Sequence, residues 1–353
     1  IGYKTIHIGK WHLGEKEEYW PEFHGFDRNI GGWKMGMPKK ENNIGGYFSP
    51  YFNPRLPDGS DDEYLTERLT EESLQFIQDS NEPFFLNFWL YNVHTPLQAR
   101  KEKIAKYDTL VRREKLQSNA VYAAMIEHMD AALGSVVDKL KETGKYENTI
   151  FIFGSDNGGF LGVRGDQEKK PRITSNHPLR SGKGDIYDGG VRVPFIVSWP
   201  TLIGGNRESD VLTISTDILP TILGLMGGKS LIPASVDGID LSSYLLEDQI
   251  PKREALYWHY PHYHTEGAEP FSAIREGNWK LIHTYEKNEL ELYNLAEDLG
   301  EQINLIEKYP QKGNELEIKL KRWKKIVHAQ DPTINENFDS LRQHLWQKSL
   351  IVW

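Results

Sequence analysis

Two oxygen-bearing side chains follow an apolar run near the middle of the chain. Asp156 and Asn157 come just after Thr149–Phe153, whose β-branched and aromatic residues predict a buried parallel strand. In open α/β sheets, ligands bind just past the carboxyl ends of such strands. A carboxylate and an amide oxygen are hard ligands suited to Ca²⁺ or Mg²⁺. The pair is therefore a candidate cation site, although Asp-Asn-Gly-Gly taken alone is also ordinary turn chemistry.

A lysine lies between two glycines further along the same segment. Lys183 stands in Leu179-Arg-Ser-Gly-Lys-Gly184. Glycine lets the backbone approach an anion closely, and the ammonium group is a compact positive charge. The alternative for Gly-Lys-Gly is a solvated loop. A second apolar run, Phe195–Trp199, then predicts another central strand.

Two more cationic side chains follow a predicted strand near the start of the chain. Tyr3–Ile8 alternates and leads into Gly9-Lys-Trp-His-Leu-Gly14. Lys10 and His12 are two positions apart, so on extended backbone they would face the same way and reach one anion. The alternative is an exposed hairpin whose lysine and histidine meet only water.

A histidine follows the other apolar run of the first third of the chain. His94 comes just after Phe84–Leu90, a predicted buried strand, in Tyr91-Asn-Val-His-Thr-Pro96. A structural role and a catalytic role are both open for a lone histidine. Its place past the end of a strand makes it a candidate for catalysis.

Composition limits the class of protein. The chain has 353 residues, a formal charge of −9 and no long basic run, so nucleic acid is not an expected partner. No apolar stretch approaches the length of a membrane span. The chain has no cysteine, which excludes disulfides and thiolate chemistry within it. It begins at Ile1, and we expect an N-terminal part, with any export signal, to precede that residue.

The elements that must position these residues alternate between strand and helix. Apolar spacing predicts helices over Tyr64–Gln78, Val121–Thr143 and Ser215–Met226, with Gly144 as the C-cap of the second. Alternation of this kind indicates a parallel α/β sheet flanked by helices. Glu15–Asp62 shows little periodicity and is rich in glycine and aromatic residues, as loops that line a site often are.

The pattern changes near residue 252. Short strands separated by Gly277-Asn278 and Lys287-Asn288 predict an antiparallel meander, packed by a helix from about Lys312 to Ala329. We therefore expect a large, mixed, mostly parallel α/β sheet over residues 1–248. A smaller C-terminal α+β subdomain, an antiparallel sheet plus a helix, is expected over 249–353.

These segments together resemble the formylglycine-dependent sulfatases of the alkaline phosphatase superfamily. The resemblance runs from Ile1 to about Leu305, and its first segment and the combination are highly specific. It rests on Gly2–Gly14, Val93–Pro96, Ser155–Gly158, Leu179–Gly184, Gly189–Pro194, Asp217–Thr221 and Ala273–Ile282. The resemblance implies an alkaline phosphatase-like fold and the hydrolysis of sulfuric esters.

The resemblance also implies roles for individual residues at the centre of the site. Asp156 and Asn157 would be two of the ligands of a Ca²⁺ ion. Lys10 and His12 would hold and activate the nucleophile, a formylglycine made from cysteine or serine. A hydrated aldehyde offers one hydroxyl to attack sulfur and a second whose deprotonation expels sulfate, so release is built into covalent catalysis.

Other residues are implied on the substrate side. His94 and Lys183 would bind the sulfate, and one or both would assist the leaving oxygen. His177 and His262 are further candidate substrate contacts. The expected partner is a small-molecule or glycan sulfate ester, and the expected location is an exported one, periplasmic, extracellular or lysosomal. The oligomeric state is left open.

The sequence departs from the family pattern at the nucleophile. No Cys/Ser-x-Pro-x-Arg pentapeptide is present, and the nearest segment, Asn176-His-Pro-Leu-Arg180, begins with asparagine. The family's paired N-terminal aspartates are also absent. We expect both before residue 1, so residues 1–353 alone are expected to be inactive.

Two other functions stay open beside the hydrolysis of a sulfate monoester, which we expect on a saccharide. A phosphodiesterase or phosphonate hydrolase of the same fold would use two metals, typically with histidine where Asn157 stands. A non-catalytic carbohydrate-binding relative would use the aromatic cluster near residue 260 for sugar stacking.

Overall fold

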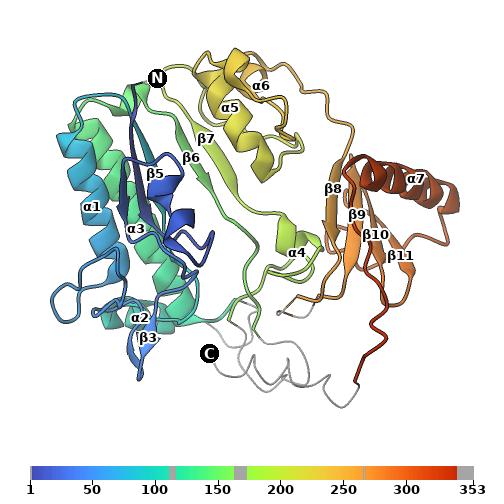
Figure 1. Cartoon of the computed structure of the whole chain (residues 1–353), viewed down its shortest axis with the longest axis horizontal. Coiled ribbons are helices and arrows are strands. Elements are labelled where there is room, and N and C mark those ends of the chain that lie inside the picture. Colours follow the sequence, from blue (N-terminus) through green and yellow to red (C-terminus); the bar gives the residue numbers. More distant parts are fainter. Residues whose placement is uncertain (1, 111–116, 163–172, 265, 267, 340–353) are drawn as a thin grey trace. The chain divides into compact units, whose positions relative to one another are not determined.

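The computed structural model describes residues 2–110, 117–162, 173–264, 266 and 268–339. The chain folds into two compact units, Ile1–Thr149 and Ile150–Trp353 (Figure 1). Each unit is described by itself below. The predicted boundary near Asp248 lies within the second unit, and the division into residues 1–248 and 249–353 stays a prediction.

The first unit is built on a parallel sheet with β1 at its centre. The strand order is β2 (Arg28–Ile30), β1 (Lys4–Gly9) and β5 (Phe84–Trp89), and both pairs are parallel. Ile6 and Ile8 of β1 are completely buried, as expected for a strand between two others. The prediction of β1 is confirmed. The strand β5 also forms as predicted, but it is not buried, since Phe85 and Trp89 are exposed at the edge of this sheet. The polar three-residue strand β2 was not predicted because it carries no hydrophobic pattern.

Three helices accompany this sheet. They are α1 (Leu65–Asp79), α2 (Lys101–Asp108) and α3 (Ala120–Glu142). α1 packs against both β1 and α3, and α2 packs against α3 (Figure 1). The side chain of Asn119 accepts a hydrogen bond of 3.1 Å from the backbone N–H of Tyr122, which caps α3 at its start. Gly144 has a φ of +68° just past its end, confirming the predicted C-cap.

The long segment between β1 and α1 is mostly irregular, as predicted. It contains the 3₁₀ turns Glu17–Tyr19 and Pro21–Phe23 and a small hairpin of β3 (Lys40–Glu41) and β4 (Ile44–Gly45). Several of its aromatic residues are buried, although Tyr19 and Phe23 are exposed. Tyr47, Tyr51 and Tyr64 are buried in the core of this unit together with Ile6 and Ile8.

A buried histidine in β1 couples the stability of this unit to pH. His7 is fully buried, with Nε2 3.2 Å from the carbonyl of Gly9 and Nδ1 3.0 Å from the amide nitrogen of Asn87. A neutral ring satisfies both contacts, since Nε2–H donates and Nδ1 accepts. Burial lowers the pKa of His7 to about 4.

We expect acidification to weaken the fold through this residue. In the unfolded chain His7 binds a proton near pH 6.5, whereas in the folded chain it does so only near pH 4. Its contribution to the free energy of unfolding is therefore complete above pH 6.5 and is lost as the pH falls toward 4. The loss should be about 3 kcal/mol. Urea unfolding from pH 7.5 to 4 should give a flatter pH dependence for His7→Gln than for wild type. The exposed His262→Gln is the control, and an unchanged slope in His7→Gln would contradict the expectation.

The second unit begins with a two-stranded antiparallel pair. β6 (Phe151–Gly154) and β7 (Phe195–Ser198) run in opposite directions, with Gly154 opposite Phe195. The prediction of a buried parallel strand is therefore wrong for β6, whose first three residues are only half-buried. The described part of the connection between these two strands contains the four-residue helix α4 (Asp188–Val191).

Short helices follow β7. They are the 3₁₀ turn Ser215–Asp217, α5 (Ile218–Leu225), the 3₁₀ turn Lys229–Leu231 and α6 (Ser242–Glu247). The predicted helix over Ser215–Met226 is confirmed, and Pro220 lies in the first turn of α5, where proline is tolerated. A further 3₁₀ turn, Tyr146–Asn148, precedes β6.

The C-terminal part of this unit is the predicted meander. Four antiparallel strands follow one another in the order β8 (Leu256–Tyr260), β9 (Phe271–Glu276), β10 (Trp279–Thr284) and β11 (Glu289–Asn294). The helix α7 (Pro310–Ile326) packs on β9 and β10 through Leu316 and Leu320, as expected. The predicted fold class is confirmed, because a parallel sheet with helices is joined by a C-terminal antiparallel sheet. Within the described ranges, no helix is both long and apolar enough to cross a membrane.

Candidate active site

Three predicted site residues of the first unit lie past one edge of the parallel sheet. β1 ends at Gly9 and β5 at Trp89, and these two residues are paired in register. Lys10 follows immediately, and its backbone N–H donates a hydrogen bond of 2.7 Å to the carbonyl of Trp89. His12 and His94 come a few residues after the two strand ends. The sheet thus directs all three residues to the edge where α/β proteins bind ligands.

The turn that carries Lys10 and His12 is not extended. His12 has a φ of +61°, in the left-handed region, and its N–H donates a hydrogen bond of 3.1 Å to the carbonyl of Trp33. The expectation that Lys10 and His12 face the same way assumed extended backbone, and that assumption is wrong at His12. The His12 ring instead packs over Gly36, where an added Cβ would lie 2.2 Å from Nδ1.

A buried indole holds this turn in place. Trp11 is buried with Trp20 and Trp33 and stacks on Trp89, with 5.8 Å between ring centroids. Its Nε1–H donates a hydrogen bond of 2.7 Å to the carbonyl of Tyr19. The cationic residues on either side of Trp11 are therefore anchored by its packing.

The loop of His94 is fixed by a buried tyrosine. The hydroxyl of Tyr47 lies 2.7 Å from the carbonyl of Tyr91 and 3.0 Å from that of His94. Nδ1 of His94 lies 2.9 Å from the carbonyl of Thr95, and a carbonyl can only accept. Nδ1 therefore carries a proton, and any proton transfer by this ring would go through Nε2.

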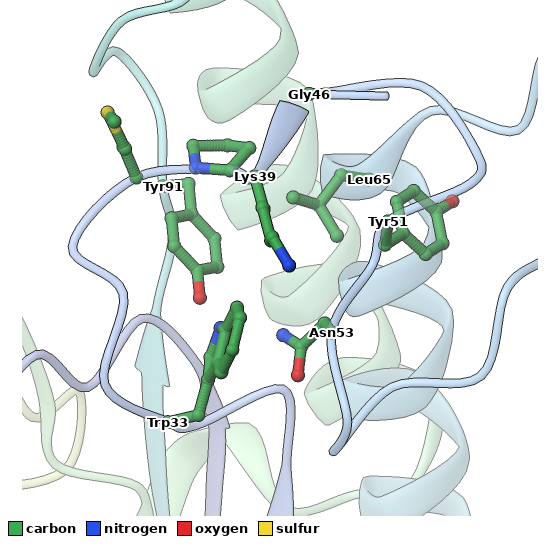
Figure 2. A pocket seen from close by; sticks show the side chains of 9 residues that line it. Trp33, Lys39, Gly46, Tyr51, Asn53, Leu65 and Tyr91 are labelled. Carbon is green, nitrogen blue, oxygen red and sulfur yellow. The ribbon is translucent and has the colours of Figure 1, made fainter. Parts of the chain in front are cut away.

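A small pocket lies beside this loop (Figure 2). The lysine Lys39 and the aromatic residues Trp33 and Tyr91 converge on it with Asn53. Asn53 donates a hydrogen bond of 2.9 Å to the carbonyl of Gly31, which fixes that side of the pocket. The full lining is Trp33, Met37, Pro38, Lys39, Gly46, Tyr51, Asn53, Leu65 and Tyr91. The aromatic and glycine content of residues 15–62 predicted that this segment lines a site, but it did not predict which of its residues do so.

In the second unit, the candidate cation ligands lie in a turn just past β6. The carboxylate of Asp156 is exposed and accepts a hydrogen bond from the side-chain amide of Asn157. The next backbone N–H, that of Gly158, donates 2.9 Å to the carbonyl of Gly190 in α4. Two adjacent hard-oxygen side chains are thus presented on a fixed turn, which suits a cation such as Ca²⁺.

The lysine loop is tied directly to this turn. Asn176 accepts from the N–H of Gly159 at 2.9 Å and donates to the carbonyls of Gly159 and Ser181 at 2.8 and 3.0 Å. The N–H of Lys183 donates 3.2 Å to the same carbonyl of Gly159. The structure therefore brings the segments of Asp156 and Lys183 together. It places His177 and His262 at the surface, and their role as substrate contacts stays a prediction.

Comparison with known proteins decides the family. Residues 1–228 match the family described as Sulfatase, and residues 182–339 match the family described as N-sulphoglucosamine sulphohydrolase, C-terminal. The chain belongs to the sulfatase family.

Relatives of this sulfatase chain include enzymes from bacteria and mammals. A sulfatase of Formosa agariphila is 34% identical over 279 residues, which cover 73% of this chain and 48% of that protein. N-acetylgalactosamine-6-sulfatase of Mus musculus is 30% identical over 281 residues, covering 73% and 49% respectively. The sulfatase chain thus spans about half the length of these curated relatives.

A solved structure shares the fold. The crystal structure of Ps i-CgsB in complex with k-i-k-neocarrahexaose superposes on this sulfatase chain with a TM-score of 0.75 at 24% identity. The match covers 99% of this chain and 77% of that one.

A buried ionic network anchors the sulfatase segments that flank Lys183. Lys280 of β10 is completely buried, with Nζ 2.7 Å from Asp188 and 2.9 Å from Glu301. The N–H of Asp188, at the start of α4, also donates 2.7 Å to Glu301. Burial raises the pKa of Glu301 and lowers that of Arg275, which lies 3.5 Å from Asp188. This network could not be predicted from the sequence, because its members are far apart along the chain.

An arginine ties the start of the lysine loop to the meander. The guanidinium of Arg180 lies 3.7 Å from the ring centre of Tyr187. It donates hydrogen bonds of 3.0 Å to the hydroxyl of Tyr293 and 2.8 Å to the carbonyl of Glu301. The antiparallel sheet therefore positions the loop of Lys183 through both Arg180 and the network of Lys280.

We expect Lys280→Met to destabilise the second unit strongly. The change leaves Asp188 and Glu301 buried without their shared cation, and breaking a buried ion pair in this way costs about 3–5 kcal/mol. Urea unfolding at pH 7 measures the loss. The exposed Lys287→Met, in the turn between β10 and β11, should stay within about 0.5 kcal/mol of wild type. A loss at Lys280 no greater than at Lys287 would contradict this role of the network.

Proposed function

We propose that the protein containing this chain hydrolyses a sulfate monoester carried by a saccharide. The observation that carries the proposal is the position of the polar residues of this sulfatase-family chain. Lys10, His12 and His94 lie past one edge of the parallel sheet. The loop of Lys183 is hydrogen-bonded to Gly159, which follows Asp156 in the turn past β6.

The chemistry explains why these residue types are needed. A sulfate ester is an anion, and preorganised cations stabilise the negative charge that develops as its ester bond breaks. Lys183 would bind the sulfate, and Lys10 and His12 would hold the nucleophile and keep it reactive. His94 would protonate the leaving oxygen through Nε2, since Nδ1 is held by the carbonyl of Thr95.

The metal proposed is one Ca²⁺ ion bound in part by Asp156 and Asn157. Their oxygen chemistry and shared position past β6 fit a hard cation, and Asn157 in place of histidine favours one ion over a two-metal centre. When bound, the ion would supply positive charge to the sulfate and to the nucleophile.

The proposed nucleophile is a formylglycine. No Cys/Ser-x-Pro-x-Arg segment is present in residues 1–353. The residues of this chain would supply its surroundings, with Lys10 and His12 nearest to it. We further propose an exported location, periplasmic, extracellular or lysosomal, which fractionation of the source cells would test.

Two of the relatives support a saccharide as the carrier of the sulfate. One is named N-acetylgalactosamine-6-sulfatase, and one structure of the same fold was solved with a neocarrahexaose.

The test is turnover by the full-length protein that contains this chain. Its substrates would be N-acetylgalactosamine 6-sulfate, sulfated carrageenan oligosaccharides, 4-nitrophenyl sulfate and bis(4-nitrophenyl) phosphate. We expect release of sulfate from at least one sugar, with kcat/KM well above that for the phosphate diester. Preference for the diester would favour the phosphodiesterase alternative, and sugar binding without turnover would favour a non-catalytic relative.

A further inference from the structure

Lys183 has an acidic partner that the sequence did not reveal. Its Nζ lies 3.3 Å from Oε1 of Glu266, which stands on the connection between β8 and β9. The two side chains are only 26% and 16% exposed, so the ion pair is largely shielded from water. A carboxylate thus lies next to the lysine that we propose as a ligand of the sulfate.

The second oxygen of this carboxylate lacks a donor within the described ranges of the chain. Oε2 of Glu266 is buried and accepts no hydrogen bond there. Nδ1 of His264 lies 3.6 Å from this oxygen, beyond hydrogen-bond reach. Buried acceptors are nearly always satisfied, so this oxygen is suited to accept a hydrogen bond from a ligand hydroxyl.

His264 contributes a donor next to that oxygen. The backbone N–H of Glu266 donates to Nδ1 of His264 at 3.1 Å. Since Nδ1 accepts, the neutral ring carries its proton on Nε2. The pair therefore offers one acceptor, Oε2 of Glu266, and one donor, Nε2–H of His264.

The lysine loop comes into direct contact with this pair. At Gly184, which has a φ of +86°, an added Cβ would lie 2.7 Å from Nδ1 of His264 and 2.9 Å from Oε2 of Glu266. Only glycine allows so close an approach in this backbone conformation. The pair is thus packed on the same loop that presents Lys183.

We propose that Glu266 and His264 recognise hydroxyl groups of the sugar that carries the sulfate. Oε2 would accept a hydrogen bond from one hydroxyl, and Nε2–H would donate one to a neighbouring oxygen. A second anion is disfavoured at Oε2, because this carboxylate oxygen would repel it. This inference rests on the proposed function and adds the residues that select a saccharide over a simple aryl sulfate.

The experiment compares two substrates in the full-length protein. The sugar sulfate turned over best has hydroxyls next to the sulfate, and 4-nitrophenyl sulfate has none. We expect Glu266→Gln and His264→Ala each to lower the ratio of kcat/KM for the sugar sulfate to kcat/KM for 4-nitrophenyl sulfate by about tenfold or more. Each change removes one hydrogen-bond partner and leaves a hydroxyl of the sugar unpaired in the site. The matched control is Glu289→Gln, an exposed glutamate of β11, whose ratio should equal that of wild type.

Other outcomes would overturn the inference. An equal loss on both substrates would mean that Glu266 only positions Lys183, and an unchanged ratio would mean that it contacts no sugar. Calorimetric binding of the sulfate-free sugar gives a readout independent of turnover, and we expect it to be about tenfold weaker in Glu266→Ala. Equal binding by wild type and variant would also refute the inference. Failure of the wild type to release sulfate from any substrate would instead refute the proposed function.

Discussion

Replacing His94 by alanine in the full-length protein should slow a sugar sulfate roughly a hundred- to ten-thousand-fold, the usual value of general acid catalysis. A sugar alkoxide is a strongly basic leaving group, so it needs a proton as the ester bond breaks. A nitrophenolate is stable without one, and its sulfate ester should slow much less. The donor would be Nε2, because Nδ1 is held 2.9 Å from the carbonyl of Thr95.

The measurement is kcat/KM for both substrates with wild type and variant. His24→Ala, which removes an exposed histidine of the first unit, is the control for general damage. Equal slowing of the two substrates would contradict acid catalysis and leave His94 with the binding of sulfate alone. Lys183 would then become the better candidate for the acid.

Replacing Asp156 by alanine should weaken Ca²⁺ binding at least about a hundredfold and reduce sulfate release in parallel. Ca²⁺ takes roughly six to eight oxygen ligands, and a carboxylate supplies both an oxygen and charge. Asp156→Asn keeps an oxygen and removes the charge, so its Ca²⁺ affinity should fall between those of wild type and Asp156→Ala. Calorimetry with Ca²⁺ on the full-length protein after chelation measures each affinity.

Asp210→Asn is the matched control, since Asp210 is an exposed carboxylate outside the turn of Asp156. It should bind Ca²⁺ like wild type. If Asp156→Ala binds Ca²⁺ as tightly as Asp210→Asn, the cation site lies elsewhere.

The fold was predictable where the hydrophobic pattern is local. The apolar runs of β1 and β5 and the helical spacing of α1 and α3 are visible in a window of a few residues, and all four elements formed as expected. The strand β2 was missed because Arg28–Ile30 has no hydrophobic pattern. It is a strand because it pairs with the edge of β1. The direction of β6 was mistaken because an apolar run carries no information about which strand it pairs with.

The candidate site was predictable in its positions and less so in its contacts. Lys10, His94 and Asp156 could be named because each comes just after a strand. The left-handed backbone of His12 could not be foreseen, since it depends on the packing of Trp11 and on the carbonyl of Trp33. The ion pair between Lys183 and Glu266 could not be predicted either, because it depends on tertiary structure. Glu266 reaches it only because the meander places the β8–β9 connection against the lysine loop.

Our main proposal for the second unit is that Lys183, Asp156 and Asn157 together hold a sulfate ester and its cation. A crystal structure of the full-length protein with Ca²⁺ and inorganic sulfate tests it most directly. We expect a sulfate within hydrogen-bond reach of Nζ of Lys183, next to a cation bound by Asp156 and Asn157. A cation bound away from Asp156 and Asn157, or a sulfate bound out of reach of Lys183, would contradict the proposal.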